Sequence, residues 1–232
     1  MESNQVFILS QSAAQAFEVL GFLEFDAKVC SASFVKNDGK LKVMAVLSNN
    51  LLGVANAPSK PCANRMVPMP QEEAEIAYRK IDKASALVIA NEALEDNIYV
   101  TGDDKLLKKY EFPTDKISQI DTKRAPPAPI EEHESHSIGT TCWDTTPEFK
   151  SMVTGGKDGC LLLRGLRNIG GEAPRPIRAH ALFSGGVTAL CFSRTRSMLY
   201  TAGGDGSIMA WNHGAKPNAA PIHGNDMNAP VR

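Results

Sequence analysis

The sequence predicts an all-β protein built from short antiparallel strands. Its apolar runs are short and mostly alternate with polar residues, which is the pattern of strands that bury one face. Clusters of Gly, Asn, Asp and Pro separate these runs, as turns separate the strands of hairpins. A strand-turn-strand pattern also recurs along the chain. With 232 residues, 43% of them hydrophobic, the chain is long enough to bury a core.

The expected strands follow the apolar runs in chain order. In the N-terminal part they are 5–9, 16–25, 28–35, 40–47 and 51–57. In the middle of the chain they are 86–90, 97–102 and 105–112. In the C-terminal half they are 138–144, 151–155, 160–166, 186–193, 198–203 and 207–211. The charged stretch 71–84 fits either a short helix or a connection between strands.

Three other segments are not expected to form regular structure. Segments 123–135 and 168–178 are rich in Pro, Gly or charge, which is typical of irregular connections. The C-terminal segment 213–232 has few large apolar residues, so we expect a flexible tail there.

Composition argues against several classes of protein. Lys and Arg total 25 against 26 Asp and Glu, so no overall charge attracts nucleic acid or an anionic membrane. The five cysteines are odd in number and lack CxxC spacing, which disfavours a disulfide framework or a zinc finger and favours a reducing compartment. Neither a basic leader followed by an apolar segment nor a long apolar window is present, so we expect neither secretion nor a membrane span.

The recurring pattern is an internal repeat. The segments VTGDDKLLKKY (100–110), MVTGGKDGCLLLR (152–164) and YTAGGDGSIMAW (200–211) each contain a strand, a glycine step, an acidic turn and a second strand. They recur roughly every 45 to 55 residues. A more degenerate copy, KVMAVLSNNLLGVANA (42–57), has Asn49-Asn50 in its turn, a dipeptide that suits positive φ angles.

The last copy contains four polar or aromatic residues at informative spacing. Asp205 lies six residues before Trp211, Thr201 lies ten before it, and His180 precedes the strand 186–193. These residue types at these offsets resemble the WD40 repeat. The resemblance implies that His180, Thr201, Asp205 and Trp211 form a buried hydrogen-bond network that locks one four-stranded propeller blade, with each polar group paired.

The preceding copy repeats most of this arrangement. Thr154 and Asp158 are spaced like Thr201 and Asp205, and the resemblance implies that His136 completes their network. Arg164 occupies the position of the tryptophan. An arginine there could reach a partner, but we expect it to be an ordinary surface residue.

The copy at 97–112 departs further from the pattern. Asp104 and Tyr110 keep the six-residue spacing, but Val100 takes the hydroxyl position and no histidine matches. The resemblance is therefore specific in the C-terminal hundred residues and weak before residue 97.

The resemblance implies a domain organisation. Residues 1–212 are expected to form an incomplete WD40-type β-propeller segment with about four to five blades and units near 28–66, 77–113, 136–166 and 180–212. Residues 5–26 would supply strands of a further blade. Alternatively, strand 5–9 would complete the last blade and close a small ring. The segment 213–232 would follow as the tail.

No constellation of residues predicts catalysis, and we expect no catalytic, cofactor or metal site. His133 and His136 near Cys142 form an i, i+3 pair in a loop without a second pair of ligands. The cysteines lack a nucleophile context, and the paired glycines do not lie between a strand and a helix, where they would cradle phosphate. Asp103 and Asp104 are adjacent and would point to opposite faces of a strand.

The resemblance implies a non-enzymatic scaffold that binds other proteins. The stretch 100–142 and the repeat after it, which lacks the Trp, also look like the large divergent WD-repeat proteins of ciliary and flagellar axonemes. This implies a cytoplasmic, cytoskeletal protein of the cilium or flagellum, with tubulin, dynein or tether subunits as partners and no nucleic acid or membrane. The alternatives are a subunit of a nuclear or ribosome-assembly complex and, less favoured, an enzyme with a site in the propeller channel.

Overall fold

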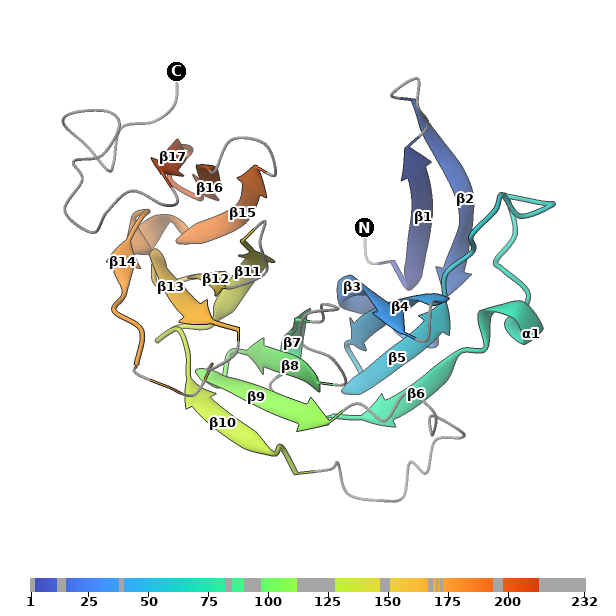
Figure 1. Cartoon of the computed structure of the whole chain (residues 1–232), viewed down its shortest axis with the longest axis horizontal. Coiled ribbons are helices and arrows are strands. Elements are labelled where there is room, and N and C mark those ends of the chain that lie inside the picture. The colour runs from blue at the N-terminus through green and yellow to red at the C-terminus, as the bar shows by residue number, and fades with distance from the viewer. Residues whose placement is uncertain are drawn as a thin grey trace. The chain divides into compact units, whose positions relative to one another are not determined.

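The chain folds into small antiparallel sheets (Figure 1). The computed structural model describes residues 3–11, 16–37, 40–81, 85–89, 97–111, 128–146, 151–166, 169, 171, 173–193 and 198–212. Within this part of the chain, the helices are α1 (Gln71–Ala74) and a 3-10 turn at Leu182–Ser184, and neither is long enough to span a membrane. The predicted all-β class is confirmed. The predicted tail, 213–232, lies outside the described residues.

The chain divides into two compact units, and the first comprises residues 1–100 and 109–130. Strands β1 (Gln5–Gln11) and β2 (Phe17–Glu24) pair as a hairpin. A four-stranded sheet follows in the order β3 (Val29–Asn37), β4 (Lys40–Leu47), β5 (Leu51–Asn56) and β6 (Ala77–Lys80). One core cluster joins Ile8 and Leu23 of the hairpin to Val43 and Leu47 of β4, so the apolar faces of the hairpin and the sheet share one core.

Another sheet has the order β10-β9-β8-β7. Its strands are β7 (Ser85–Ile89), β8 (Asn97–Gly102), β9 (Leu106–Glu111) and β10 (Glu131–Glu134). Residues 101–108, which include the turn between β8 and β9, belong to the second unit together with residues 131–232.

The second unit contains two further sheets. One has the order β11 (Thr140–Thr145), β12 (Ser151–Gly156), β13 (Cys160–Gly165) and β14 (Ile177–Arg178). The other contains β15 (Val187–Ser193), β16 (Met198–Gly203) and β17 (Ile208–Asn212). Val153 and Leu161 of the first pack in one core with Val187, Phe192 and Leu199 of the second.

The same hairpin turn occurs in four sheets. It joins β4 to β5, β8 to β9, β12 to β13 and β16 to β17. The last turn residue has positive φ in each: Asn50 (63°), Lys105 (66°), Gly159 (76°) and Gly206 (77°). Gly and Asn adopt this conformation readily, whereas Lys105 pays a steric cost because it carries a larger side chain. The repeat predicted from sequence therefore corresponds to a shared backbone geometry.

In three of these sheets, the carbonyl of the positive-φ residue also anchors the chain as it returns past the sheet. The Ile81 amide donates to Asn50 O (3.0 Å), the Ser135 amide to Lys105 O (2.8 Å), and the Ala179 amide to Gly159 O (2.8 Å). The strand-turn-strand pattern thus fixes the end of the outer strand that follows it.

The structure corrects several expectations about the connections. Segment 71–84 begins with the one-turn helix α1, in line with the short-helix alternative, and continues into strand β6, which was not expected and pairs with β5. Segments 123–135 and 168–178, expected to be irregular, contain the outer strands β10 and β14. Strand β1 pairs along its whole length with β2, and the sheet of β15 to β17 has three strands within the described residues.

Candidate functional site

The sheet of β15 to β17 brings together the four residues that the last repeat singled out. His180 is buried just after β14, with Nδ1 3.2 Å from Asp205 Oδ1 and Nε2 2.9 Å from Thr201 Oγ1. The Trp211 indole donates to Thr201 Oγ1 at 3.0 Å. Because that oxygen accepts the indole proton, its own hydroxyl proton can point at His180 Nε2, which places the imidazole proton on Nδ1, facing Asp205.

Asp205 also holds the turn between β16 and β17. Its carboxylate accepts the Ser207 hydroxyl at 2.6 Å, the Ser207 amide at 3.0 Å and the Ala181 amide at 3.1 Å. These bonds favour the ionised form, so the Ser207 hydroxyl above all holds the pKa of Asp205 well below its usual range. One carboxylate thus ties the turn to the segment that carries His180.

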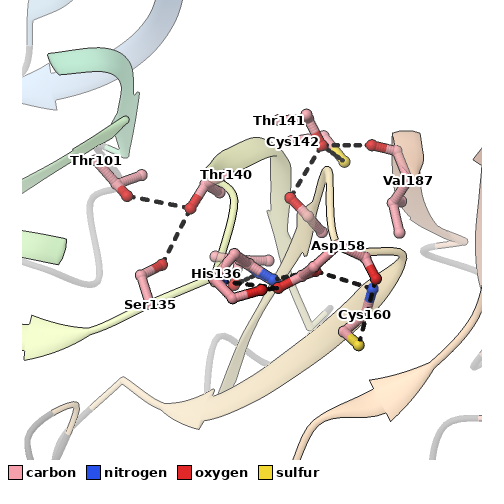
Figure 2. Close-up of polar contacts among 12 residues, drawn as sticks. Thr101, Ser135, His136, Thr140, Thr141, Cys142, Asp158, Cys160 and Val187 are labelled. Atoms are coloured by element: carbon pink, nitrogen blue, oxygen red, sulfur yellow. Dashed lines mark hydrogen bonds and ion pairs between the residues drawn. The ribbon is translucent and has the colours of Figure 1, made fainter. Parts of the chain in front are cut away.

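The neighbouring sheet has a matching network around His136 (Figure 2). His136 Nδ1 lies 3.0 Å from Asp158 Oδ1, and Nε2 lies 3.0 Å from Thr154 Oγ1. The Ser137 amide donates to Asp158 Oδ2 at 2.9 Å, and the Cys160 amide donates to Oδ1 at 3.0 Å. The sequence-predicted residues His136, Thr154 and Asp158 therefore meet at the turn of β12 and β13.

Burial sets the protonation states in this second network. It lowers the pKa of His136 despite the opposing effect of Asp158, so the buried imidazole is neutral at neutral pH. Burial alone would raise the pKa of Asp158, but the amides of Cys160 and Ser137 and the contact with His136 lower it on balance. The carboxylate is therefore ionised and held by its amide donors.

Arg164 occupies the position that tryptophan has in the other sheet, and the expectation that it lies on the surface is wrong. Its side chain is 6% exposed. Its Nη2 donates to the Glu134 carbonyl, whereas Nε has no acceptor among the described residues. Burial lowers the pKa of Arg164. This part of the sheet therefore encloses a guanidinium group instead of an indole.

The turn between β8 and β9 pairs its aspartate with a lysine. Lys108, 4% exposed, forms an ion pair with Asp104 Oδ2, and the Leu106 amide donates to Oδ1 at 3.3 Å. Lys108 lies four residues after Asp104, where Leu162 and Met209 stand in the other two sheets. This repeat has no matching histidine, and the lysine of β9 faces the aspartate instead.

A chain of hydroxyl groups lies beside this turn. Val100 was expected at the hydroxyl position, but the buried hydroxyl is that of Thr101, 3.1 Å from Thr140 Oγ1. Thr140 Oγ1 also lies 3.0 Å from Ser135 Oγ (Figure 2). Alignment on the aspartate missed Thr101 because it sits one position later than Thr154 and Thr201. Nothing in the local sequence marks Lys108, because a lysine in a strand ordinarily faces solvent.

Two glycines make room for the imidazoles. A Cβ at Gly156 would lie 2.4 Å from His136 Cγ, and a Cβ at Gly203 would lie 2.2 Å from His180 Nδ1. Both distances are far below van der Waals contact. Each buried ring therefore requires a residue without a side chain two positions before the turn aspartate.

The polar groups of these networks are satisfied by one another and by backbone, which is the arrangement of a structural lock. No group of three or more metal-ligating side chains occurs within the described residues. All five cysteines are free thiols, and burial raises the pKa of Cys142 and of Cys160, which disfavours the reactive thiolate. His133 contacts Glu131 at 3.1 Å and lies outside both networks.

One comparison with known proteins identifies a family in the last repeat. The family model described as "WD domain, G-beta repeat" matches residues 172–212, the segment that carries His180, Thr201, Asp205 and Trp211. Residues 172–212 are a WD40 repeat. The repeat and the small antiparallel sheets are consistent with a fold of the β-propeller type.

The other comparisons address the fold alone. The crystal structure of the computationally designed Ika4 protein is similar, with a TM-score of 0.51 and 14% identity over 85% of this chain and 99% of that chain. Matches to solved structures number 1133 chains, so the architecture is widespread and does not select a function. No curated protein matches the sequence.

Proposed function

We propose that this protein is a scaffold that binds other proteins. The observation that carries the proposal is the WD40 repeat at 172–212, since domains of this kind are generally non-catalytic binding platforms. The networks at both turns support it, because their histidines and aspartates are committed to holding loops in place. A scaffold needs loops with fixed geometry, because ordering them beforehand lowers the entropic cost of binding.

Exposed apolar side chains offer contact surfaces on each unit. Phe17 is 72% exposed, and the exposed Phe7 and Leu9 belong to the same β1–β2 hairpin. In the second unit, Phe183 is 99% exposed on the 3-10 turn after His180. A fully exposed phenylalanine has no role in the core, and aromatic residues are common anchors of protein interfaces.

Crosslinking followed by mass spectrometry tests the proposal. The tagged full chain is crosslinked gently in its native cells, and the co-purifying proteins are compared with those of Phe17→Ser and Phe183→Ser variants. We expect a defined set of partners, reduced by at least one of the two substitutions and unchanged by the exposed-site control Lys60→Ser. Recovery of the same background from all variants and from an unrelated tagged protein would contradict the scaffold role.

A narrower hypothesis concerns the cellular setting. The resemblance of stretch 100–142 and the following repeat to divergent axonemal WD-repeat proteins supports a tether in the cilium or flagellum, bound to tubulin, dynein or other tether subunits. The same crosslinking experiment tests it. Axonemal proteins among the partners would support this setting, whereas ribosomal precursors or nuclear complexes would support the alternative and leave the general scaffold role intact.

A further inference from the structure

The second unit contains a hollow of about 570 Å³ beside the His136 network. Leu162 and Arg164 of β13, Ser135 and Ser137 next to His136, and Pro174 and Pro176 before β14 contribute to its lining. Its volume falls within the range of small-ligand and side-chain binding pockets. Apolar walls and a few polar groups surround the same space, as in sites that orient a specific group.

The burial of Arg164 in the wall of this hollow is not explained by the contacts that it makes. Its guanidinium is buried, donates one bond to a carbonyl, and has a buried Nε without an acceptor among the described residues. No carboxylate pairs with it among these residues, and burial lowers its pKa. A buried cation without a counter-charge is unfavourable, and a guanidinium is well suited to bind a carboxylate with two parallel hydrogen bonds.

The nearby carboxylate in the lining is not free to fill that role. Asp158 lines the same hollow, but its oxygens accept bonds from the Ser137 and Cys160 amides and contact His136. The other acidic residues of the lining, Glu132 and Glu134, are exposed on β10. The lining therefore contains the buried cation of Arg164, the exposed cation of Arg178, and the exposed carboxylates of Glu132 and Glu134.

We propose that this hollow binds a side-chain carboxylate of a partner protein, with Arg164 as its counter-ion and with a basic residue of the partner facing Glu132 and Glu134. The proposal rests on the scaffold function above and names the chemistry of one partner segment. A carboxylate in the hollow supplies the missing counter-charge of Arg164. An adjacent lysine or arginine complements Glu132 and Glu134 and sets the direction in which the segment lies.

Peptide binding by the full chain tests the proposal directly. The probes are short labelled peptides with blocked termini that carry one central glutamate between lysines, and matched peptides with glutamine in its place. We expect the glutamate peptides to bind the wild-type protein about tenfold more tightly or better, because a charge-assisted bidentate pair replaces a neutral contact. Equal affinity for the two sets would overturn the proposal.

Substitutions of Arg164 separate binding from folding. Arg164→Met and Arg164→Trp remove the buried charge, so we expect both to abolish the preference for glutamate while the urea midpoint stays the same or rises. The matched control is Arg175→Met, which removes an exposed arginine outside the lining and should retain the preference. A preference that persists in a folded Arg164→Met protein would refute the role of Arg164.

Two further experiments identify the source of the carboxylate. They also distinguish failure of the proposed binding hollow from failure of the proposed scaffold function. Free acetate that binds the wild type as tightly as the peptides do would overturn a partner segment as the ligand. Crosslinking with Arg164→Met in native cells should lose a subset of partners. If it recovers every wild-type partner, the hollow is refuted and the scaffold function stands. If wild type recovers no partners, the scaffold function fails, and the glutamate-glutamine comparison still decides the chemistry of the hollow.

Discussion

The β15–β17 sheet and the β11–β14 sheet build the same turn with different closing residues. Both hold a buried histidine between a strand threonine and a turn aspartate, with distances that agree to within a few tenths of an ångström. They differ where Trp211 donates to Thr201 in one and Arg164 turns to the Glu134 carbonyl in the other. The histidine, threonine and aspartate thus hold the turn in both sheets, and the last position is free to change its chemistry.

The β8–β9 turn differs from both of these sheets in the partner of its aspartate. Asp104 is kept, but its cationic partner is Lys108 from the third strand of the repeat. The turn therefore depends most on the aspartate, which accepts the backbone amide two residues ahead in all three sheets. The partner of the aspartate can come from a different element.

The largest expected effect comes from breaking the complete network. Asp205→Ala removes the carboxylate that contacts His180 Nδ1 and accepts the amides of Ala181 and Ser207, and Trp211→Ala opens a cavity. Each should lower the free energy of unfolding by roughly 2 to 4 kcal/mol. Urea denaturation measures both. Midpoints equal to that of the wild type would show that this network does not lock the sheet.

A smaller loss is expected from the turn that uses lysine. Asp104→Ala removes the carboxylate facing the buried Lys108 ammonium and should destabilise the protein by about 2 kcal/mol, below the range for a fully buried pair because Asp104 is partly exposed. The double variant Asp104→Ala, Lys108→Met should recover part of that loss. A double variant as unstable as the sum of its single changes would indicate that the two side chains do not interact.

A stabilising change should sharpen the comparison among the turns. Lys105 has φ of 66° where Gly159 and Gly206 occupy the corresponding positions. Lys105→Gly removes the steric cost of that conformation and should stabilise the protein by about 0.5 to 1 kcal/mol, less whatever flexibility glycine adds to the unfolded chain. Thermal melts of this variant and of Lys109→Gly, which places glycine inside β9, should move in opposite directions.

The smallest expected effect is a change in how the free energy of unfolding depends on pH. The folded pKa of His136 lies below its unfolded value of 6.5, so its contribution to stability is complete above that pH and is lost as pH falls below it. The folded pKa of Asp158 is also lowered, so its contribution is lost below its ordinary value of 3.8. Urea midpoints from pH 7.5 to 5 should fall less steeply for His136→Gln than for the wild type. Parallel slopes would contradict a neutral buried imidazole.

The sequence predicted inner strands better than outer ones. Strands such as β4 and β12 are recognisable because buried residues occupy them in continuous or alternating runs. Strands β10 (EEHE) and β14 (IR) were missed because they are short and mainly exposed. Their pairing depends on the carbonyls of Lys105 and Gly159, which anchor the returning chain. Such long-range bonds leave little trace in local composition.

In the candidate site, too, residues set by spacing within one repeat could be predicted, and contacts between distant segments could not. Spacing along one repeat was enough to nominate His180, Thr201, Asp205 and Trp211, which the structure brings together. The burial of Arg164 could not be predicted, because it depends on the carbonyl of Glu134 in a different sheet. Lys108 was missed for a related reason: a lysine in an alternating strand ordinarily faces solvent, and the paired Asp104 is what allows its burial.

Gly156 and Gly203 restrict the order in which the glycine and the histidine of such a repeat can be substituted. Because a methyl group at either position would overlap an imidazole ring, a repeat that still has its histidine cannot first exchange the glycine without expelling the ring. The reverse sequence of changes meets no such obstacle. The β8–β9 repeat, which has no matching histidine, still has Gly102 two residues before Asp104, and a lysine is the partner of that aspartate.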